Sequence, residues 1–410
     1  MGVDIRVIGA EQWPDYVRAA FVPFGGEATE SDIRDSRIEW EPDRSIAAFD
    51  GDLIVGTTSV VSLRMTVPGG VEVSVAGVTT VGVAPTHRRR GILRSMMRRQ
   101  LDDSKAQGYP VAALWASEPA IYQRFGYGMA TRQASARVPR AHTAWLTPPP
   151  AGGQVRLVPF DAAAKQLGPV YDRARPGTPG MLVRDEAWWS YRFQHLNAEH
   201  HRGGFGPMFF ALHEGPEGPD AYAVYRVKSD DEDGIDQGVV QVVEAVTTTP
   251  ESVQGMWSFL FGIDLVETIE FWNRPPDDPL FSMVLDLRRM GPKVLDGMWL
   301  RLLDVPAALS QRGYGPTGRL VFELTDEFCG WNSGTYELVV SRDGAECVRA
   351  DGADPELSFT ANELGGVYLG GMRVRDLARA GRIVQHSPGS VARADAMFAG
   401  DREPWCPHQF

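Results

Sequence analysis

A block of arginines beside a glycine is the part of this sequence best suited to chemistry. Arg88, Arg89 and Arg90 precede Gly91, and from about Arg89 the spacing of the apolar residues, Ile92 first, is that of a helix. A glycine at a helix start lets a ligand approach the N–H groups that the first helical turn leaves unpaired, and the helix dipole favours an anion there. Arginines add charge and forked donors. The pattern predicts a cradle for a pyrophosphate group, with a solvated basic helix start as the alternative.

Two strands must flank this cradle if it is to hold a ligand. The apolar run from Val78 to Val83 suits a strand, and Pro85 breaks it before the helix. A second strand is expected from Val111 to Trp115, after the helix. Tyr122 follows that strand, and its phenol, with a reference pKa of about 10, stays protonated at neutral pH and can donate a proton. The alternative is that Tyr122 only packs in an aromatic cluster.

The spacing Arg88-x-x-Gly91 resembles the acyl-CoA-binding motif of the GNAT superfamily of N-acetyltransferases, usually Q/R-x-x-G-x-G/A, although Leu93 stands at the last small position. The strings APTHRRRG and AALWASEPAIYQRFGYG are similar to the enhanced intracellular survival (Eis) family of bacterial acetyltransferases within that superfamily. The resemblance extends over the whole chain, in its length, its three-part organisation and its terminal phenylalanine.

This resemblance implies acetyl-CoA as co-substrate, with no metal. It implies that Tyr122 is the general acid for the leaving sulfur and that the main-chain carboxylate of Phe410, with a reference pKa of about 3.3–3.7, is the general base. A frayed chain end is the alternative for Phe410, and His408 is the runner-up base. The cofactor contacts that the resemblance implies are Val81, Gly82, Val83, Arg88, Arg89, Arg90, Gly91, Ile92, Leu93, Arg94, Ser117 and Glu118.

The resemblance also implies that the acceptors are amino groups of polyamines such as aminoglycosides. A protein lysine acetyltransferase and a non-catalytic acyl-CoA- or lipid-binding protein are the alternatives. Acidic residues between positions 27 and 43, among them Glu30, Asp32, Asp35 and Glu39, are candidates for admitting a cationic amine. A solvated helix face explains them equally well.

Composition limits the partners and the compartment. The chain has 41 basic and 53 acidic residues and a net charge of −12, which argues against nucleic acid as the main partner. Its three cysteines are too few and too scattered for a disulfide framework or a zinc site. Without an apolar run of membrane-spanning length or a signal region, we expect a cytoplasmic protein with no membrane partner. The family resemblance implies a homo-oligomer, a homohexamer.

The order of the expected elements predicts three domains of mixed α+β and α/β class. Residues 1–146 are expected to form an acetyltransferase domain with the acetyl-CoA site, and residues 154–290 repeat its strand, proline, helix order without the arginines. The second domain is therefore expected to be a degenerate acetyltransferase fold, and residues 147–153 a linker. This domain is expected to contain a hairpin of strands Tyr222–Lys228 and Val239–Thr247 across the acidic turn 230–234. In residues 298–410, a helix near Val305, three short strands from Arg319 onward and then three helices indicate an α+β domain. The resemblance implies a sterol-carrier-like fold there that delivers the C-terminal carboxylate to the active site, and an ordinary core is favoured over a lipid tunnel.

Overall fold

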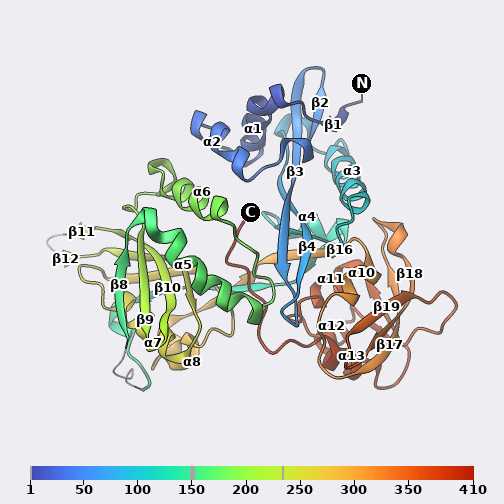
Figure 1. Cartoon of the computed structure of the whole chain (residues 1–410). Coiled ribbons are helices and arrows are strands. Elements are labelled where there is room, and N and C mark those ends of the chain that lie inside the picture. The colour runs from blue at the N-terminus through green and yellow to red at the C-terminus, as the bar shows by residue number, and fades with distance from the viewer. Residues whose placement is uncertain (1, 148–152, 233–234) are drawn as a thin grey trace. The chain divides into compact units, whose positions relative to one another are not determined.

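The structure is a computed structural model that describes residues 2–147, 153–232 and 235–410 (Figure 1). The chain forms two compact units. The first unit contains residues 1–131 and 297–410, and the second contains residues 132–296. Each unit has its own seven-stranded sheet, so each is described by itself.

The first unit is built on a sheet whose strand order is β1-β2-β3-β4-β5-β16-β6. Its strands are β1 (Asp4–Val7), β2 (Ser45–Asp50), β3 (Leu53–Thr66), β4 (Glu72–Val83), β5 (Val111–Trp115), β16 (Met298–Leu302) and β6 (Gly128–Met129). Every neighbouring pair is antiparallel except β4 and β5, which run parallel. A parallel pair needs a crossover connection, and helix α3 (Ile92–Ala106) supplies it.

Helix α3 lies along β2, β3 and β4 and buries an apolar stripe against them. Met96, Met97 and Leu101 of this stripe are fully buried, as its helical spacing requires. Helix α1 (Trp13–Phe21) also contacts β3 and β4, and a short helix α2 (Glu30–Asp35) follows it. These helices fix the strand end at which the predicted cradle lies.

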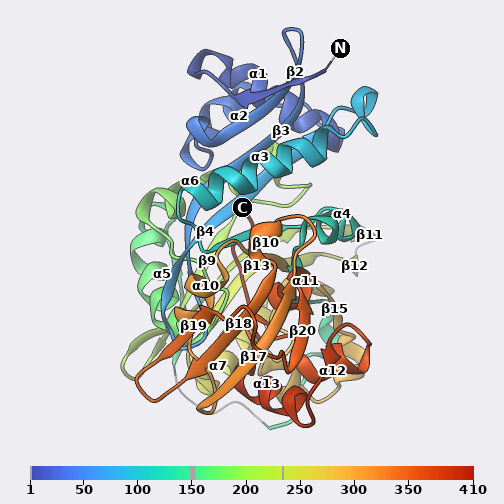
Figure 2. The ribbon, with the colours of Figure 1, turned by 90° about the vertical axis from the view of Figure 1, so that its right-hand side faces the viewer.

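The remainder of the first unit carries a five-stranded sheet of order β19-β18-β17-β20-β21, seen face-on in Figure 2. The strands are β17 (Gly318–Thr325), β18 (Gly334–Val340), β19 (Ala345–Arg349), β20 (Leu357–Thr360) and β21 (Val384–Gln385), and the helices are α10 (Val305–Ser310), α11 (Ala361–Val367), α12 (Val374–Arg379) and α13 (Ser390–Phe398). Three of these strands and all four helices coincide with the predicted order. Strands β20 and β21 are too short to show a period in the sequence.

The second unit has the strand order β15-β7-β14-β13-β10-β9-β8. These strands are β7 (Arg132–Pro139), β8 (Gln154–Val158), β9 (Phe209–Gly215), β10 (Gly218–Lys228), β13 (Val239–Thr247), β14 (Thr268–Arg274) and β15 (Lys293–Asp296). Its longer helices are α5 (Phe160–Ala174), α6 (Glu186–Asn197) and α7 (Pro250–Phe261). Helix α7 follows β13, and its Met256, Trp257 and Leu260 are buried in the core of this unit. The predicted hairpin and the helix after it are therefore present.

The compact units do not follow the predicted domain boundaries at residues 146 and 298. Strand β7, assigned from the sequence to the first domain, pairs with β14 and β15 in the second sheet. Strand β16, which begins at residue 298, lies between β5 and β6 in the first sheet. The first sheet therefore takes β16 from the predicted third domain, and the second sheet takes β7 from the predicted first domain. Strand pairing between distant segments leaves no local signal, so the sequence pattern could not reveal this exchange.

Residues 148–152 of the predicted linker and residues 233–234 of the expected acidic turn lie outside the described residues. Within the described ranges, no helix is both long enough and apolar enough to cross a membrane.

Candidate functional site

The parallel strands β4 and β5 separate partway along their length. They pair from Val75 with Val111 to Val78 with Leu114, and β4 then continues to Val83. Strand β3 still pairs with one edge of this extension. On the other edge, the pairing among the described residues ends at Val78. Main-chain groups of residues 79–83 therefore border an opening in the sheet, and Val81, Gly82 and Val83 are the predicted cofactor contacts there.

A β-bulge bends β4 where it leaves β5. Ser59 pairs with Thr79 and Thr57 with Gly82, so Thr80 and Val81 together stand opposite one residue of β3. Thr80 has a φ of 52°, a conformation that is strained for a β-branched residue. Its side-chain oxygen lies 3.0 Å from the Tyr16 hydroxyl, and its carbonyl accepts a hydrogen bond from the Thr57 hydroxyl at 2.7 Å. These two hydroxyl groups compensate the strain and hold the bulge.

Helix α3 begins later than the sequence indicated. The helical spacing predicts a start near Arg89, but α3 begins at Ile92 because Arg89 and Gly91 both have positive φ values, 64° and 80°. Gly91 is the N-cap residue, and no side chain caps the helix. An N-terminus without a side-chain cap leaves main-chain donors for an anion. Open space lies beside Gly91, since an added Cβ would meet no atom within 4 Å.

The predicted cofactor residues of this turn divide into two groups. Arg88, Arg89 and Arg90 are exposed beside Gly91, whereas Ile92 is buried and Leu93 is partly buried in the core. Ile92 and Leu93 can therefore offer only main-chain groups to a ligand. The guanidinium of Arg94 lies 5.1 Å from the ring centroid of Phe328 and is directed toward the C-terminal part of the unit. No sequence pattern indicates this contact of Arg94 with Phe328, because the two residues lie far apart along the chain.

His87 anchors the turn before α3. Its Nε2 lies 3.1 Å from Asp50 Oδ2, and its Nδ1 lies 2.8 Å from the Thr86 hydroxyl. Arg90 is also 3.8 Å from Asp50. Asp50 ends β2, so these contacts join the turn to the β2–β3 hairpin.

Tyr122, the predicted acid, ends the short helix α4 (Pro119–Tyr122) and is only 5% exposed. It packs in the core cluster that contains Val78 and Leu114, the last residues of the parallel pairing. Burial raises the pKa of Tyr122 to about 12, the nearby Glu118 carboxylate contributes in the same direction, and a hydrogen bond with the Ser117 side chain opposes them. The phenol is therefore a proton donor throughout the neutral pH range.

The C-terminal residues dock on the same strands. The indole N–H of Trp115, at the end of β5, donates to the carbonyl of His408 at 3.1 Å. Trp405, Cys406 and His408 are buried. The ring of Phe410 lies beside Gly77 of β4, where an added Cβ would come within 3.2 Å of it. Figures 1 and 2 both show this end of the chain beside β4. The segment is docked, contrary to the alternative of a frayed end.

Tyr122 and Phe410 approach the opening from opposite faces of the sheet. Val78 packs with Tyr122, whereas the preceding residue, Gly77, faces Phe410. Successive side chains of a strand point to opposite faces. The core cluster of Tyr122 and the ring of Phe410 thus lie on opposite sides of the strand at Gly77 and Val78, where β4 and β5 part.

The acidic residues between positions 27 and 43 have partners of their own. Asp32 forms a capping box with Thr29 at the start of α2. Glu30 pairs with Arg18 at 3.1 Å, and Asp35 pairs with Arg34 at 2.7 Å. Three of the four candidate acids are therefore partly neutralised locally, which weakens the expectation that they attract a cationic substrate.

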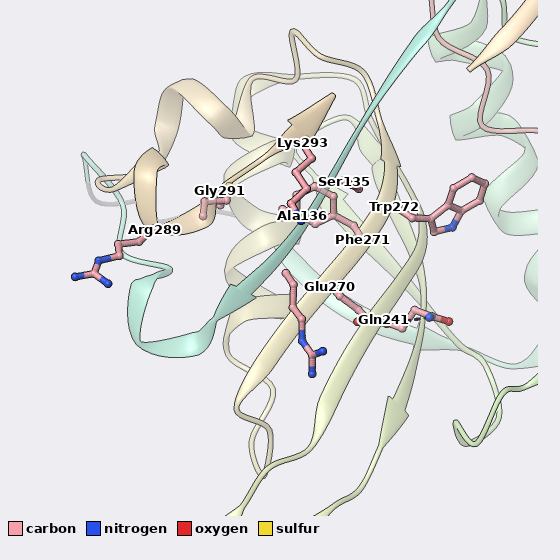
Figure 3. Close-up of a pocket in the computed structure, with 11 residues that line it drawn as sticks. Ser135, Ala136, Gln241, Glu270, Phe271, Trp272, Arg289, Gly291 and Lys293 are labelled. Atoms are coloured by element: carbon pink, nitrogen blue, oxygen red, sulfur yellow. Dashed lines mark hydrogen bonds between the residues drawn. The ribbon is translucent and has the colours of Figure 1, made fainter. Parts of the chain in front are cut away.

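A pocket of about 420 Å³ lies in the second unit, on the face formed by β7, β13 and β14. It contains none of the predicted site residues. Three cations contribute to its lining, Arg137, Arg289 and Lys293. Figure 3 shows that Arg289 and Trp272 point to opposite sides of the group, so its polar side chains do not converge on one point.

Known proteins match the chain in all three parts. Acetyltransferase (GNAT) domain families match residues 4–130 and 180–302, and the sterol carrier protein domain matches residues 305–407. An uncharacterized N-acetyltransferase of Streptomyces avermitilis is 40% identical over the full length of both chains. The N-acetyltransferase Eis of Mycobacterium tuberculosis is 37% identical. The match covers 86% of this chain and 85% of the Eis chain. The crystal structure of Eis1 from Mycobacterium abscessus has a TM-score of 0.85 and 32% identity, covering 99% of this chain and all of that chain.

These matches confirm the predicted fold class, tandem GNAT domains followed by a sterol-carrier-like domain. The GNAT fold implies the use of an acyl-CoA. The chain belongs to the Eis family of N-acetyltransferases in the GNAT superfamily.

Proposed function

We propose that this chain transfers the acetyl group of acetyl-CoA to amino groups of polyamine substrates such as aminoglycosides. The observation that carries the proposal is the pair of groups at the β4–β5 opening, a protonated phenol on one face and the last residue of the sequence on the other. Amine acetylation needs a proton acceptor for the attacking ammonium and a proton donor for the leaving sulfur.

Two features of the first unit fit an acyl-CoA. The uncapped N-terminus of α3, with Arg88, Arg89 and Arg90 beside it, suits a pyrophosphate. The main chain of Val81, Gly82 and Val83 suits the amide-bearing arm, because an extended ligand can add to the open edge of a strand. Ser117 and Glu118, exposed at the end of β5, would lie near the thioester.

The acyl-CoA supplies an acetyl group activated as a thioester. The Phe410 carboxylate accepts a proton from the substrate ammonium, and its negative charge attracts that ammonium. The free amine then attacks the thioester carbonyl, a C–N bond forms, and the C–S bond breaks as the Tyr122 phenol protonates the leaving sulfur. The proton that the new amide nitrogen loses restores the phenol. Main-chain N–H groups of the bulged strand polarise the carbonyl that is attacked. His408 is the alternative base. We extend the proposal to a homohexamer, which a sedimentation mass equal to one 45.1 kDa chain would exclude.

The proposal is tested by measuring acetyl-CoA-dependent thiol release with an aminoglycoside as acceptor. Four proteins are compared: the native chain, a chain extended by a few residues beyond Phe410, Phe410→Leu and Tyr122→Phe. The extension keeps the aromatic ring but moves the carboxylate, whereas Phe410→Leu alters the ring and keeps the carboxylate. We expect turnover to collapse in the extended chain and to fall by about 10²- to 10⁴-fold in Tyr122→Phe, with acetyl-CoA affinity retained in both.

Other outcomes redirect the proposal. Turnover that survives the extension would transfer the base role to His408 or water. Acetyl-CoA binding without thiol release would exclude this class of acceptor and favour a protein lysine or a non-catalytic role.

A further inference from the structure

The main chain of the segment that carries Tyr122 has few hydrogen bonds within the segment itself. Helix α4 is one turn long, and it is followed by a 3₁₀ turn (Gln123–Phe125) and by Gly126, whose φ is 79°. Two hydrogen bonds close the turn internally, from the Gly126 N–H to the Gln123 carbonyl and from the Tyr127 N–H to the Tyr122 carbonyl. Short, irregular segments of this kind depend on contacts from outside to keep one conformation.

These outside contacts come from the C-terminal part of the first unit. The side-chain amide of Asn362 donates to the carbonyls of Gln123 and Tyr127, at 2.9 and 2.8 Å. Arg301 donates to the carbonyl of Phe125 between them. Three alternate carbonyls of the tyrosine segment, residues 122–127, are thus bound by donors that lie far along the chain.

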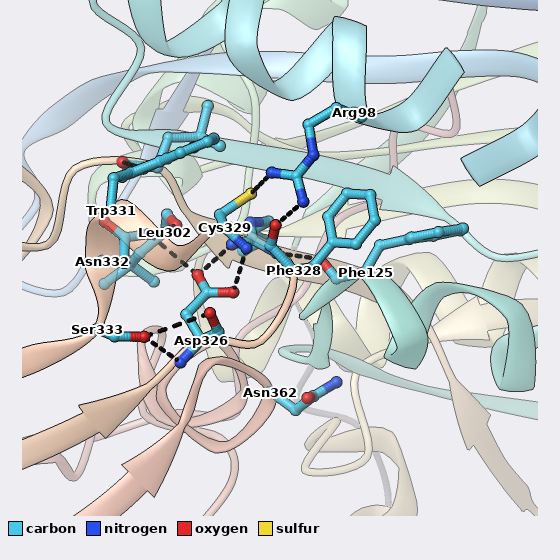
Figure 4. Close-up of polar contacts among 12 residues, drawn as sticks. Arg98, Phe125, Leu302, Asp326, Phe328, Cys329, Trp331, Asn332, Ser333 and Asn362 are labelled. Atoms are coloured by element: carbon cyan, nitrogen blue, oxygen red, sulfur yellow. Dashed lines mark hydrogen bonds and ion pairs between the residues drawn. The ribbon is translucent and has the colours of Figure 1, made fainter. Parts of the chain in front are cut away.

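The supports for these donors are buried and well connected. The Arg301 side chain is 0% exposed and pairs with Asp326, which also accepts from the Cys329 N–H at 2.8 Å and from the Asn332 amide at 3.3 Å. Figure 4 shows this network, with Arg98 reaching Cys329 and the Phe328 carbonyl. Asn362 lies below Asp326 in this view. The rings of Phe125 and Phe328 are 5.0 Å apart and add an apolar contact.

The main chain of Asn362 lies so close to Gly128 that a side chain at position 128 would not fit. Asn362 stands in the first turn of α11, which packs on β16 and β6. An added Cβ at Gly128 would lie 1.8 Å from the Asn362 carbonyl. The helix is therefore seated directly against the strand that follows the tyrosine segment.

We propose that Asn362 is a positioning residue for acetyl transfer: its amide clamps the tyrosine segment and so fixes the Tyr122 phenol, an inference that rests on the proposed function. Asn362 does not touch the reacting atoms. A displacement of about 1 Å of a proton donor can cost about 10²-fold in rate, so a main-chain clamp on the donor's own turn has a measurable effect. The sterol-carrier-like part thereby acts on the chemistry through the acid, independently of the C-terminal carboxylate.

The test is a double-mutant cycle of Asn362→Asp with Tyr122→Phe, read as thiol release with an aminoglycoside. Asn362→Asp keeps the shape of the side chain but replaces the donor by an oxygen that faces two carbonyls. We expect kcat to fall by about 10- to 100-fold with the KM for acetyl-CoA within about twofold of native. In the Tyr122→Phe background the same change should have almost no effect, because there is no acidic proton left to position.

Trp331→Phe is the matched control. Its indole N–H donates to the Leu303 carbonyl at 3.1 Å, within the C-terminal part of the unit, rather than to a carbonyl of the tyrosine segment. We expect its kcat to remain within about twofold of native. A native chain that turns over no faster than Tyr122→Phe would overturn the proposed acid. A fast native chain with equal losses from Asn362→Asp in both backgrounds would overturn the clamp alone.

Hydrogen exchange supplies a second readout that does not depend on turnover. In Asn362→Asp, amide exchange over residues 122–128 should rise, because the clamp no longer opposes local opening, while exchange over β4 should not change. Unchanged exchange over residues 122–128 would contradict the clamp whatever the acceptor proves to be.

Discussion

Two segments of this chain run through the same order of elements and end differently. In the first unit, β4 pairs in parallel with β5 for four residue pairs and leads to α3. In the second, β13 pairs in parallel with β14 for four residue pairs and leads to α7. The helix start and strand edge of the first segment are open, whereas those of the second are occupied by its own side chains.

The helix starts show the difference most directly. Helix α3 begins after Gly91 with no side-chain cap. Helix α7 begins with Pro250, which has no N–H, and its Ser252 N–H is bound by the Thr249 hydroxyl at 3.1 Å. The Asp220 carboxylate lies 3.5 Å from that hydroxyl and 2.6 Å from His213 Nδ1. An internal anion thus stands at the start of α7, where α3 offers a place to an external one.

The strand edges differ in the same way. Three residues beyond the last parallel pair of β13, the carbonyl of Ala245 accepts from the guanidinium of Arg274 on β14. Arg274 is buried and pairs with Asp278 at 2.6 Å. The equivalent position on β4 is Val81, a predicted cofactor contact. In the second unit, a side chain of the neighbouring strand thus fills the strand edge that stays open on β4 in the first unit.

Arg274→Met should produce the largest effect of the substitutions that test this comparison. It leaves Asp278 buried without its cation, so we expect the second unit to lose about 3–5 kcal/mol of unfolding free energy. Chemical denaturation, with hydrogen exchange over β13 as the probe of unfolding, measures the loss. Acetyl-CoA affinity of the folded protein should not change. The double variant Arg274→Met/Asp278→Asn should recover most of the stability, and a parallel loss of cofactor affinity would contradict the comparison.

Gly91→Asp gives the first unit the internal anion of the second. The new carboxylate would compete for the N–H groups of α3 and repel a pyrophosphate, so we expect acetyl-CoA to bind about 10- to 30-fold more weakly, or about 1.4–2 kcal/mol. Titration calorimetry measures the change. Gly108→Asp is the control, because Gly108 follows the other end of α3 at a similar φ of 84° with the same open space. Equal losses in the two variants would remove the case for an anion site at Gly91.

Thr249→Ala removes the cap of α7 and should cost about 1 kcal/mol of unfolding free energy. Thr249→Ser, which keeps the hydroxyl, should remain close to native stability. Thermal unfolding compares the three proteins. Neither variant should alter acetyl-CoA affinity, and a clear weakening in Thr249→Ala would indicate that α7 takes part in binding after all.

The phenols of the two units give the smallest expected effect. Burial raises the pKa of both, to about 12 for Tyr122, and the Tyr222 hydroxyl donates to the Glu244 carboxylate. Since the folded pKa of Tyr122 exceeds the unfolded value of about 10, its contribution to stability is complete below pH 10 and is lost as the pH rises toward 12. We expect kcat to change by less than about twofold between pH 8 and 10. A descending limb centred near pH 10 that Tyr122→Phe lacks would contradict this expectation.

Much of the fold could be predicted from the sequence because its strands have strong local patterns. The expected ranges Val111–Trp115 and Val239–Thr247 coincide with β5 and β13. The failures are of another kind. The start of α3 was misplaced because a left-handed turn at Arg89 and Gly91 interrupts the helical spacing. The exchange of β7 and β16 escaped notice because pairing between distant strands has no local signature.

The candidate site shows the same division. The residue types and spacing around Gly91 indicate an anion cradle by themselves, and the family resemblance added Tyr122 and Phe410. The Tyr16 hydroxyl contacts Thr80, which is 64 positions away along the chain. The Asn362 amide binds carbonyls of the tyrosine segment that are more than 230 positions away. No spacing in one sequence could reveal them.

The exchanged strands have a consequence for how the protein is made. Strand β5 pairs on one side with β16, and Leu114 and its partner Trp299 are about 185 residues apart along the chain. At roughly 5–20 residues per second, synthesis takes about 10–40 s to pass from one to the other. During that time the nascent acetyltransferase sheet exposes an apolar strand edge of the kind that promotes aggregation. The first domain to leave the ribosome is therefore completed only after the second has been synthesised, and fragments that end near residue 131 should require a chaperone or aggregate.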